Sequence, residues 1–140
     1  MQRVVADANV LVSAALARSP QAPSVLTLDA ALDGRIELVT SPLLLQEVAM
    51  VLARPRLQKY VSADEAIRFV ADLAAQTTLL VDQPDPPPVC RDSRDDYLVA
   101  LAKASGAEAI ITGDLDLFAI DPGQLAVEIL TPRQFVGRLS

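Results

Sequence analysis

Four acidic residues stand where their carboxylates could work together: Asp7, Glu47, Asp96 and Asp114. Each belongs to a different predicted helix or strand and lies near its end. The chain contains no histidine, which excludes imidazole acid–base chemistry, Ser-His-Asp and Cys-His triads, and most zinc sites. Any chemistry must therefore use carboxylates, hydroxyls, amines or a bound hard cation.

Asp7 is the most informative of these acids. It interrupts a stretch rich in β-branched residues, and a buried carboxylate in such a stretch carries a large desolvation cost unless it is paired. Asp114 follows a second apolar stretch, Ala109 to Thr112. Open α/β sheets bind ligands at the carboxyl ends of their strands. We therefore expect Asp7 and Asp114 at that edge of one sheet.

Simpler roles remain open for the other acidic residues. Asp96 and its neighbour Asp95 begin a predicted helix, where a negative charge stabilises the helix dipole. Glu47 could be an ordinary exposed helical residue, and Asp114 and Asp116 could be turn formers. Convergence of the four acids is therefore a hypothesis at this point.

Carboxylates gathered in this way would require a cation. Two of them about 4 Å apart repel by roughly 4 kcal/mol at an effective dielectric constant of about 20. Oxygen ligands alone select Mg²⁺ or Mn²⁺ ahead of zinc, and water bound to such an ion can be lowered toward hydroxide and attack phosphorus. Without metal, neutralising one acid, as in Asp96→Asn, is expected to relieve the repulsion.

Hydrophobic periodicity, caps and turn residues predict alternating strands and helices. Strands are predicted at Arg3 to Val12, Ile36 to Val39, Thr78 to Val81, Ala109 to Thr112 and Val127 to Leu130, and helices at Ala22 to Leu32, Leu43 to Ala53, Ser62 to about Ala75, Asp95 to Ser105 and from Pro132 onward. The proline-rich segment Gln83 to Val89 must be an extended loop. The alternation predicts one α/β domain over residues 1–140, with a parallel or mostly parallel sheet covered on both faces.

Composition narrows the setting. No apolar run approaches the roughly 20 residues of a membrane span, so we expect a soluble protein. Asp7 and Asn9 interrupt the apolar start of the chain, which argues against an export signal. The single cysteine, Cys90, cannot form an internal disulfide, and this favours the reducing cytoplasm.

The net charge of −6 argues against a protein that coats nucleic acid, because such domains usually carry a basic face. A nucleic-acid substrate would have to be held locally. The candidates for substrate binding are Arg54, Arg56 and Lys59, after the Glu47 helix, and Arg91 and Arg94, before the Asp96 helix. A solvated surface is an equally good explanation for them.

Four stretches of sequence, in order, resemble the motifs of the PIN-domain family. They are Val4 to Ser13, which delivers Asp7 and Asn9; Ser41 to Val48, with Glu47; Arg91 to Ala102, with Asp96; and Ile110 to Leu117, with Asp114. The resemblance covers nearly the whole chain, and it is closest to the small bacterial VapC-like toxins of toxin–antitoxin pairs.

The resemblance implies a three-layer α/β/α ribonuclease that uses Mg²⁺ or Mn²⁺ to hydrolyse RNA. The residues implied as metal ligands are Asp7, Glu47, Asp96, Asp114 and, as an accessory acid, Asp116; Asn9 and Thr112 would support the site or the attacking water. Whether Asp92 or Asp95 shares the metal stays open. A small antitoxin that places an arginine or lysine near the carboxylates is the expected partner, and a homodimer is a further possible assembly.

Two other classes of function remain. Receiver domains and haloacid-dehalogenase-like phosphatases also carry an aspartate after the first strand, although they require another acid near the position of Asn9. A catalytically silent binding domain of the same fold would act only through a partner protein. Phosphorylation of Asp7 by acetyl phosphate would favour the first class, and absence of metal-dependent cleavage would favour the second.

Overall fold

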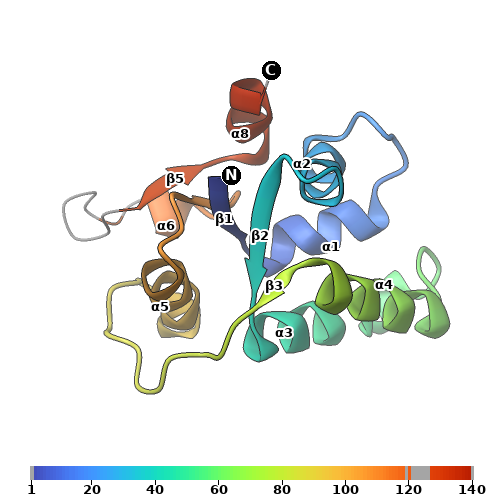
Figure 1. Cartoon of the computed structure of the whole chain (residues 1–140). Coiled ribbons are helices and arrows are strands. Elements are labelled where there is room, and N and C mark those ends of the chain that lie inside the picture. Colours follow the sequence, from blue (N-terminus) through green and yellow to red (C-terminus); the bar gives the residue numbers. More distant parts are fainter. Residues whose placement is uncertain (1, 119, 121–126, 140) are drawn as a thin grey trace.

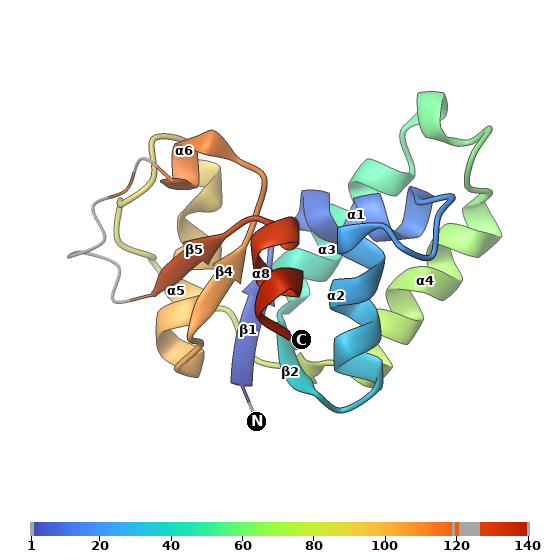
Figure 2. The ribbon, with the colours of Figure 1, turned by 90° about the horizontal axis from the view of Figure 1, so that it is seen from above.

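The strands form one parallel sheet. The computed structural model describes residues 2–118, 120 and 127–139. Its strands are β1 (Gln2–Ala6), β2 (Ile36–Thr40), β3 (Thr78–Leu79), β4 (Ala109–Ile111) and β5 (Glu128–Leu130), in the order β3-β2-β1-β4-β5. Every pairing is parallel, and Figure 2 shows β1, β4 and β5 side by side. The predicted sheet is confirmed.

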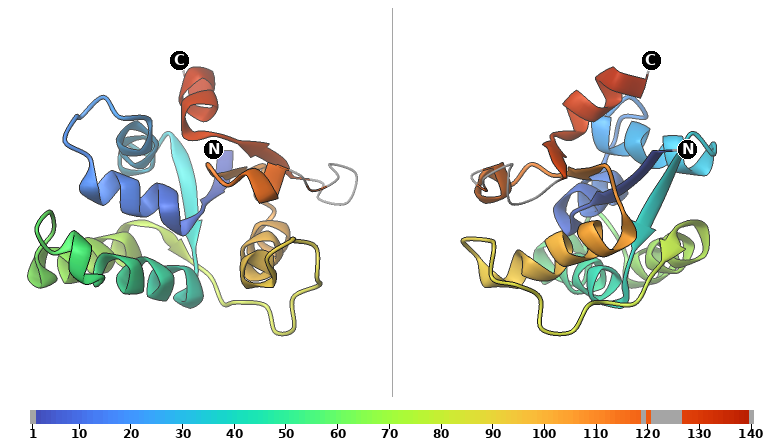
Figure 3. Two further views of the ribbon diagram at one scale, coloured as in Figure 1. Left: turned by 180° about the vertical axis from the view of Figure 1, so that it is seen from behind. Right: turned by 60° about the vertical axis from the view of Figure 1, so that its left-hand side comes forward.

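Helices cover both faces of this sheet. They are α1 (Ala8–Leu16), α2 (Pro23–Leu32), α3 (Pro42–Leu52), α4 (Ala63–Gln76), α5 (Asp96–Ser105), α6 (Leu115–Phe118) and α8 (Pro132–Leu139), with short 3-10 turns at Pro55–Leu57 and Ser93–Asp95. Helices α2 and α8 lie on one side of the sheet, and α3, α4 and α5 lie on the other (Figures 1 and 3). The expected three-layer α/β/α arrangement is confirmed. No described helix is long and apolar enough to cross a membrane.

Short apolar strands build the core. In β1 the side chains of Val4, Val5 and Ala6 are all fully buried, and the β4 residues Ile110 and Ile111 are equally buried. A parallel strand with helices on both faces has no solvent face, so its residues are apolar without alternation. This packing therefore holds β1 and β4 in place, together with Asp7 and Thr112, which directly follow them.

Helix boundaries follow the signals in the sequence. The Ser41 hydroxyl accepts a hydrogen bond from the Leu44 N–H, and Ser62 and Glu65 form the predicted capping box. Gly106 ends α5 with φ 70°, a left-handed conformation that glycine adopts without steric cost. These boundaries place Glu47 in the second turn of α3.

The prediction for residues 3–12 was wrong in its second half. The strand ends at Ala6, and α1 begins at Ala8. Asp7 is the N-cap of this helix: its carboxylate accepts the Val10 N–H at 2.9 Å. The apolar residues after Asp7 are buried on a helix rather than in a strand, and a short apolar run does not distinguish these two cases. The four-residue helix α6 was also not predicted.

Candidate active site

Asp7 lies at the carboxyl end of β1, between the strand and α1. Its side chain is 7% exposed. One carboxylate oxygen accepts the Val10 N–H, and the other accepts the hydroxyl of Thr112, the residue after β4. The Thr112 oxygen in turn accepts the Asp114 N–H at 2.9 Å. Neighbouring parallel strands thus bring Asp7, Thr112 and Asp114 to one edge of the sheet.

The electrostatics of Asp7 reflect this crowding. Burial raises the pKa of its carboxyl group, and the charges of Asp114 and Glu47 raise it further. The hydrogen bonds from Thr112 and Val10 act in the opposite direction, but the net shift is upward. Ionised Asp7 is therefore disfavoured by its neighbours and would be stabilised by a nearby positive charge.

Asp95 joins the same acidic group. Burial, followed by the charges of Asp114, Asp92, Glu47 and Asp7, raises the pKa of its carboxyl group to about 6. Asp95 is the last residue of the 3-10 turn and directly precedes α5.

Asp96 has a different environment from its neighbour. It is 5% exposed, and one of its carboxylate oxygens accepts the backbone N–H groups of Val89 and Cys90 at 3.2 and 2.8 Å. These bonds fix the end of the proline-rich loop against the start of α5. Asp96 therefore anchors this loop through one carboxylate oxygen.

Asp92 is engaged outside the acidic group. The Arg94 guanidinium donates to both of its carboxylate oxygens, with a closest distance of 2.8 Å. These bonds and the Arg94 N–H lower the pKa of Asp92. Of the two residues left open for sharing the metal, Asp95 is the one whose charge is opposed by the other acids.

Glu47 reaches the site from α3 and is linked to α5. The Tyr97 hydroxyl donates to a Glu47 carboxylate oxygen at 2.5 Å. Burial and Glu47 both raise the pKa of Tyr97, so this hydroxyl stays protonated. This contact was not predicted from the sequence, although Tyr97 directly follows the predicted site residue Asp96.

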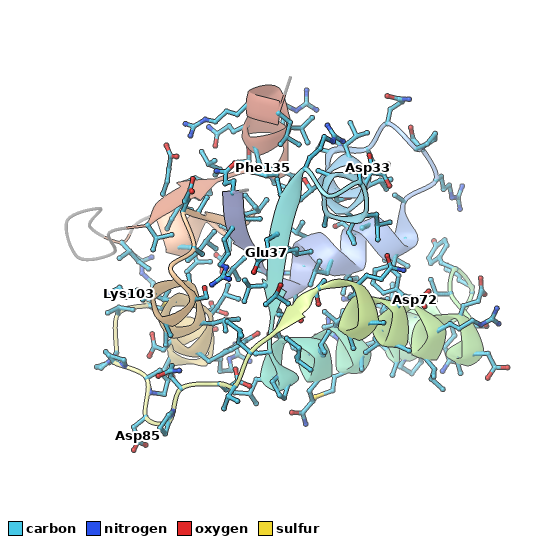
Figure 4. All side chains as sticks on the ribbon, in the orientation of Figure 1. Asp33, Glu37, Asp72, Asp85, Lys103 and Phe135 are labelled. Carbon is cyan, nitrogen blue, oxygen red and sulfur yellow. The ribbon has the colours of Figure 1, made fainter. Side chains whose placement is uncertain are left out.

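The connection from β3 to α5 spans the space between α3 and α5 (Figures 1 and 3). At its start, the Asp82 carboxylate accepts the Leu43 N–H at 2.9 Å and so caps α3. At its end it is held by Asp96, and Asp85 lies at its outermost part (Figure 4). Asp82 has a second, buried oxygen without a hydrogen-bond partner among the described residues. Asp82 thus ties the start of this loop to α3, and Asp96 ties its end to α5.

Two other predicted site residues add little to this geometry. Asn9 is exposed in the first turn of α1. Asp116 belongs to α6, but its side chain lies outside the described part of the structure. The roles predicted for both residues stay predictions.

The donor set suits a hard cation in its chemistry. The acids supply only oxygen ligands, and burial together with the charges of the neighbouring acids raises the pKa values of Asp7 and Asp95. Mg²⁺ and Mn²⁺ prefer such ligands. Among the described residues, no three acidic, histidine or cysteine side chains stand close enough to hold a metal as they are. The chemistry of these ligands therefore fits a hard cation, and binding one would require the carboxylates to move closer together.

The predicted substrate-binding residues form two groups. Arg54, Arg56 and Lys59 are exposed beyond the end of α3. Lys59 lies over the Tyr60 ring at 5.1 Å, and Arg18, from the segment after α1, lies at 5.8 Å from the same ring. In the second group, Arg91 and Arg94 are exposed, and the Arg94 charge is offset by Asp92.

Comparisons with known proteins found one related sequence and several structures of similar fold. An uncharacterized protein of Methanocaldococcus jannaschii, MJ1680, is 28% identical over 96% of this chain and 89% of the relative. The structure is similar to VapBC2 of Rickettsia felis, solved with a DNA fragment from their promoter (TM-score 0.65, 10% identity, 93% of this chain and 98% of that chain). It is also similar to VapC20 of Mycobacterium tuberculosis, a toxin that cleaves the sarcin–ricin loop (TM-score 0.58, 14% identity, 84% and 96%).

A family model for the PIN domain matches residues 3–116. This span contains Asp7, Glu47, Asp95, Asp96 and Asp114, and it ends within α6. The match covers most of the chain, and the parallel α/β/α fold is consistent with it. This protein therefore belongs to the PIN-domain family.

Proposed function

We propose that this protein is a metal-dependent endoribonuclease and the toxin of a toxin–antitoxin pair. The observation that carries the proposal is the acidic group at the carboxyl edge of the sheet, in which Asp114 and Glu47 act on the buried Asp7. The likeness to VapC20, a toxin that cleaves the sarcin–ricin loop, supports the proposal of an RNA substrate. The free thiol of Cys90 supports a reducing compartment, the cytoplasm.

The proposed mechanism assigns the carboxylates to metal binding. Asp7, Glu47, Asp114 and one or both of Asp95 and Asp96 would hold Mg²⁺ or Mn²⁺. The bound metal would supply a water of lowered pKa and would neutralise charge on the phosphate oxygens. Thr112 would orient Asp7 through its hydroxyl, and the supporting roles of Asn9 and Asp116 stay predictions from the family resemblance.

The basic residues would hold the RNA backbone. Glu47 lies five residues before the end of α3 at Leu52, about 8 Å along the helix axis, and Arg54 follows just beyond that end. Arg54, Arg56 and Lys59 could therefore bind phosphates a few nucleotides from the scissile bond. Arg91 lies at the end of the loop that leads into α5. Arg94 would contribute less, because Asp92 already pairs with it.

The proposed partner is a small antitoxin with a cationic segment. Burial and the charges of the other acids disfavour ionised Asp7 and Asp95, so a lysine or arginine placed among them would be stabilised and would exclude the metal. VapBC2 is a toxin–antitoxin assembly of the same fold. An inhibitory partner that bound far from Asp7, with the metal still in place, would contradict this mechanism.

The decisive experiment measures cleavage of structured RNAs by the partner-free protein with Mn²⁺ and with EDTA. Cleavage should require the metal and should be lost in Asp7→Asn, which removes one charge at nearly constant volume. Asp33→Asn is the matched control. Asp33 is exposed beside α2, on the side of the sheet away from α3 and α5 (Figure 4), so this variant should cleave as the wild type does.

The outcome also separates the other two classes of function. Cleavage that persists in EDTA or in Asp7→Asn would refute the proposal. A folded, partner-free protein that cleaves no RNA would instead favour a silent binding domain. The PIN-domain match over residues 3–116 already favours a nuclease over a phosphotransfer domain, and the hydrogen bonds on both Asp7 oxygens are unfavourable for a nucleophilic carboxylate.

A further inference from the structure

Tyr97 makes a contact that links the two helices on either side of the acidic group. Its hydroxyl donates to Glu47 at 2.5 Å, and the two residues are 50 positions apart in the chain. Glu47 belongs to α3 and Tyr97 to the first turn of α5. Both helices lie on the same side of the sheet, and the loop from β3 to α5 runs between them (Figure 1). The hydrogen bond therefore joins α3 to α5 beside the acidic group.

Glu47 needs such a contact more than the other acids do. Asp7 and Asp96 are buried and accept backbone N–H groups, so their carboxylates are fixed by the fold. Glu47 is exposed, and within the described residues Tyr97 is the one hydrogen-bond donor to it. Ordering a free glutamate side chain costs on the order of 1 to 2 kcal/mol of entropy. An unheld Glu47 would therefore bind a cation more weakly.

Tyr97 is suited to hold a carboxylate in place. Its ring packs against the hydrophobic core, which fixes the position of the hydroxyl. Burial raises the pKa of this hydroxyl, and the charges of Glu47, Asp95 and Asp82 raise it further. A neutral donor in such surroundings orients a carboxylate without adding a further negative charge.

We propose that Tyr97 is a positioning residue that orients Glu47 toward the metal-binding group. The inference rests on the proposed function, because it assumes that the acids bind a divalent cation. It adds a residue with no metal-binding role of its own. The predicted consequence is a loss of cation affinity when the hydroxyl alone is removed.

The first test compares Tyr97→Phe with the wild type by calorimetric titration with Mn²⁺. The ring remains, so unfolding by urea should change little, whereas Mn²⁺ affinity should fall about three- to tenfold, the net effect of one ordinary hydrogen bond at an exposed acceptor. Tyr60→Phe is the matched control and should bind Mn²⁺ as the wild type does. Tyr60 is the other tyrosine of the chain, and its ring lies beside Arg18 and Lys59 instead of an acid.

A double variant separates orientation from a general structural effect. If Tyr97 acts through Glu47, adding Tyr97→Phe to Glu47→Gln should lower Mn²⁺ affinity no further than Glu47→Gln alone. Equal additional losses in both backgrounds would show that Tyr97 acts in another way and would overturn the inference.

Fluorescence gives a readout that needs neither RNA nor catalysis. The chain has no tryptophan and two tyrosines, so in Tyr60→Phe all tyrosine emission comes from Tyr97. Mg²⁺ should change this emission as Glu47 engages the cation, and it should not do so after Glu47→Gln. Wild-type protein that binds cation while Tyr97→Phe binds it equally well would overturn this inference alone. Wild-type protein that binds no cation would overturn the proposed function together with it.

Discussion

Neutralising Asp95 should stabilise the metal-free protein at neutral pH, whereas neutralising the adjacent Asp96 should destabilise it. Asp95 faces the charges of Asp114, Asp92, Glu47 and Asp7. Asp96 instead accepts two backbone N–H groups, and such bonds are stronger when the acceptor is charged. Replacing each residue in turn by asparagine therefore probes opposite environments at nearly constant volume.

The magnitude follows from the pKa of Asp95. Burial and the neighbouring acids raise this pKa from 3.8 to about 6 in the folded protein. A folded pKa above the unfolded one favours folding while the group is protonated, and this advantage is lost as the pH rises through the folded value. The full shift corresponds to about 3 kcal/mol. Asp95 is partly exposed, so screening by solvent reduces the expected effect to about 1 kcal/mol.

The assay is urea unfolding of the wild type and the two variants in EDTA, at pH 4 and at pH 7.5. Asp95→Asn should come close to the wild type at pH 4, where Asp95 of the folded protein is protonated, and exceed it by about 1 kcal/mol at pH 7.5, where folded Asp95 is ionised. Asp96→Asn should be less stable than the wild type at pH 7.5 by about 1 to 2 kcal/mol, because two buried bonds lose their charged acceptor. Added Mg²⁺ should narrow the difference between Asp95→Asn and the wild type.

Two results would refute this reasoning. Asp95→Asn that is less stable than the wild type at pH 7.5 would mean that Asp95 serves the helix dipole of α5 and is not opposed by other acids. A stabilisation that is equal at both pH values would mean that it does not arise from ionisation. Stabilisation by Asp96→Asn, as expected from the sequence alone, would show that repulsion outweighs its two hydrogen bonds.

Three further predictions concern the frame of the site and the metal. Thr112→Val should lower the free energy of unfolding by about 1.5 to 3 kcal/mol, because buried Asp7 loses its hydroxyl donor; Thr112→Ser should keep most of it, and equal losses in both would contradict this role. Gly106→Ala should lower the free energy of unfolding in urea by about 1 to 2 kcal/mol, because φ is 70° at this position and the left-handed conformation is costly for a residue with a Cβ. An unchanged urea midpoint would argue against that conformation. Mg²⁺ at about 100 times its dissociation constant should stabilise the wild type by about 2.7 kcal/mol in thermal melts, and a response of equal size in Asp7→Asn would count against Asp7 as a ligand.

Much of the fold could be predicted because its signals are local. The capping box at Ser62 and the proline after Ser41 each specify a helix start through contacts within four residues. The parallel sheet followed from short apolar strands separated by helices. Local patterns failed after Asp7, because burial of an apolar stretch is compatible with either a strand or a helix. There the N-cap bond from Val10 to Asp7 decides the structure.

The site shows the same limit at finer scale. The sequence places Asp95 and Asp96 side by side, but consecutive residues at a helix start point about 100° apart. Which of them faces the other acids depends on where the 3-10 turn Ser93–Asp95 passes into α5. That junction is fixed by Val89 and Cys90, whose N–H groups bind Asp96. The direction of Asp95 is thus set by backbone N–H groups of the preceding loop, which is why spacing alone could not separate an anchoring aspartate from one opposed by other acids.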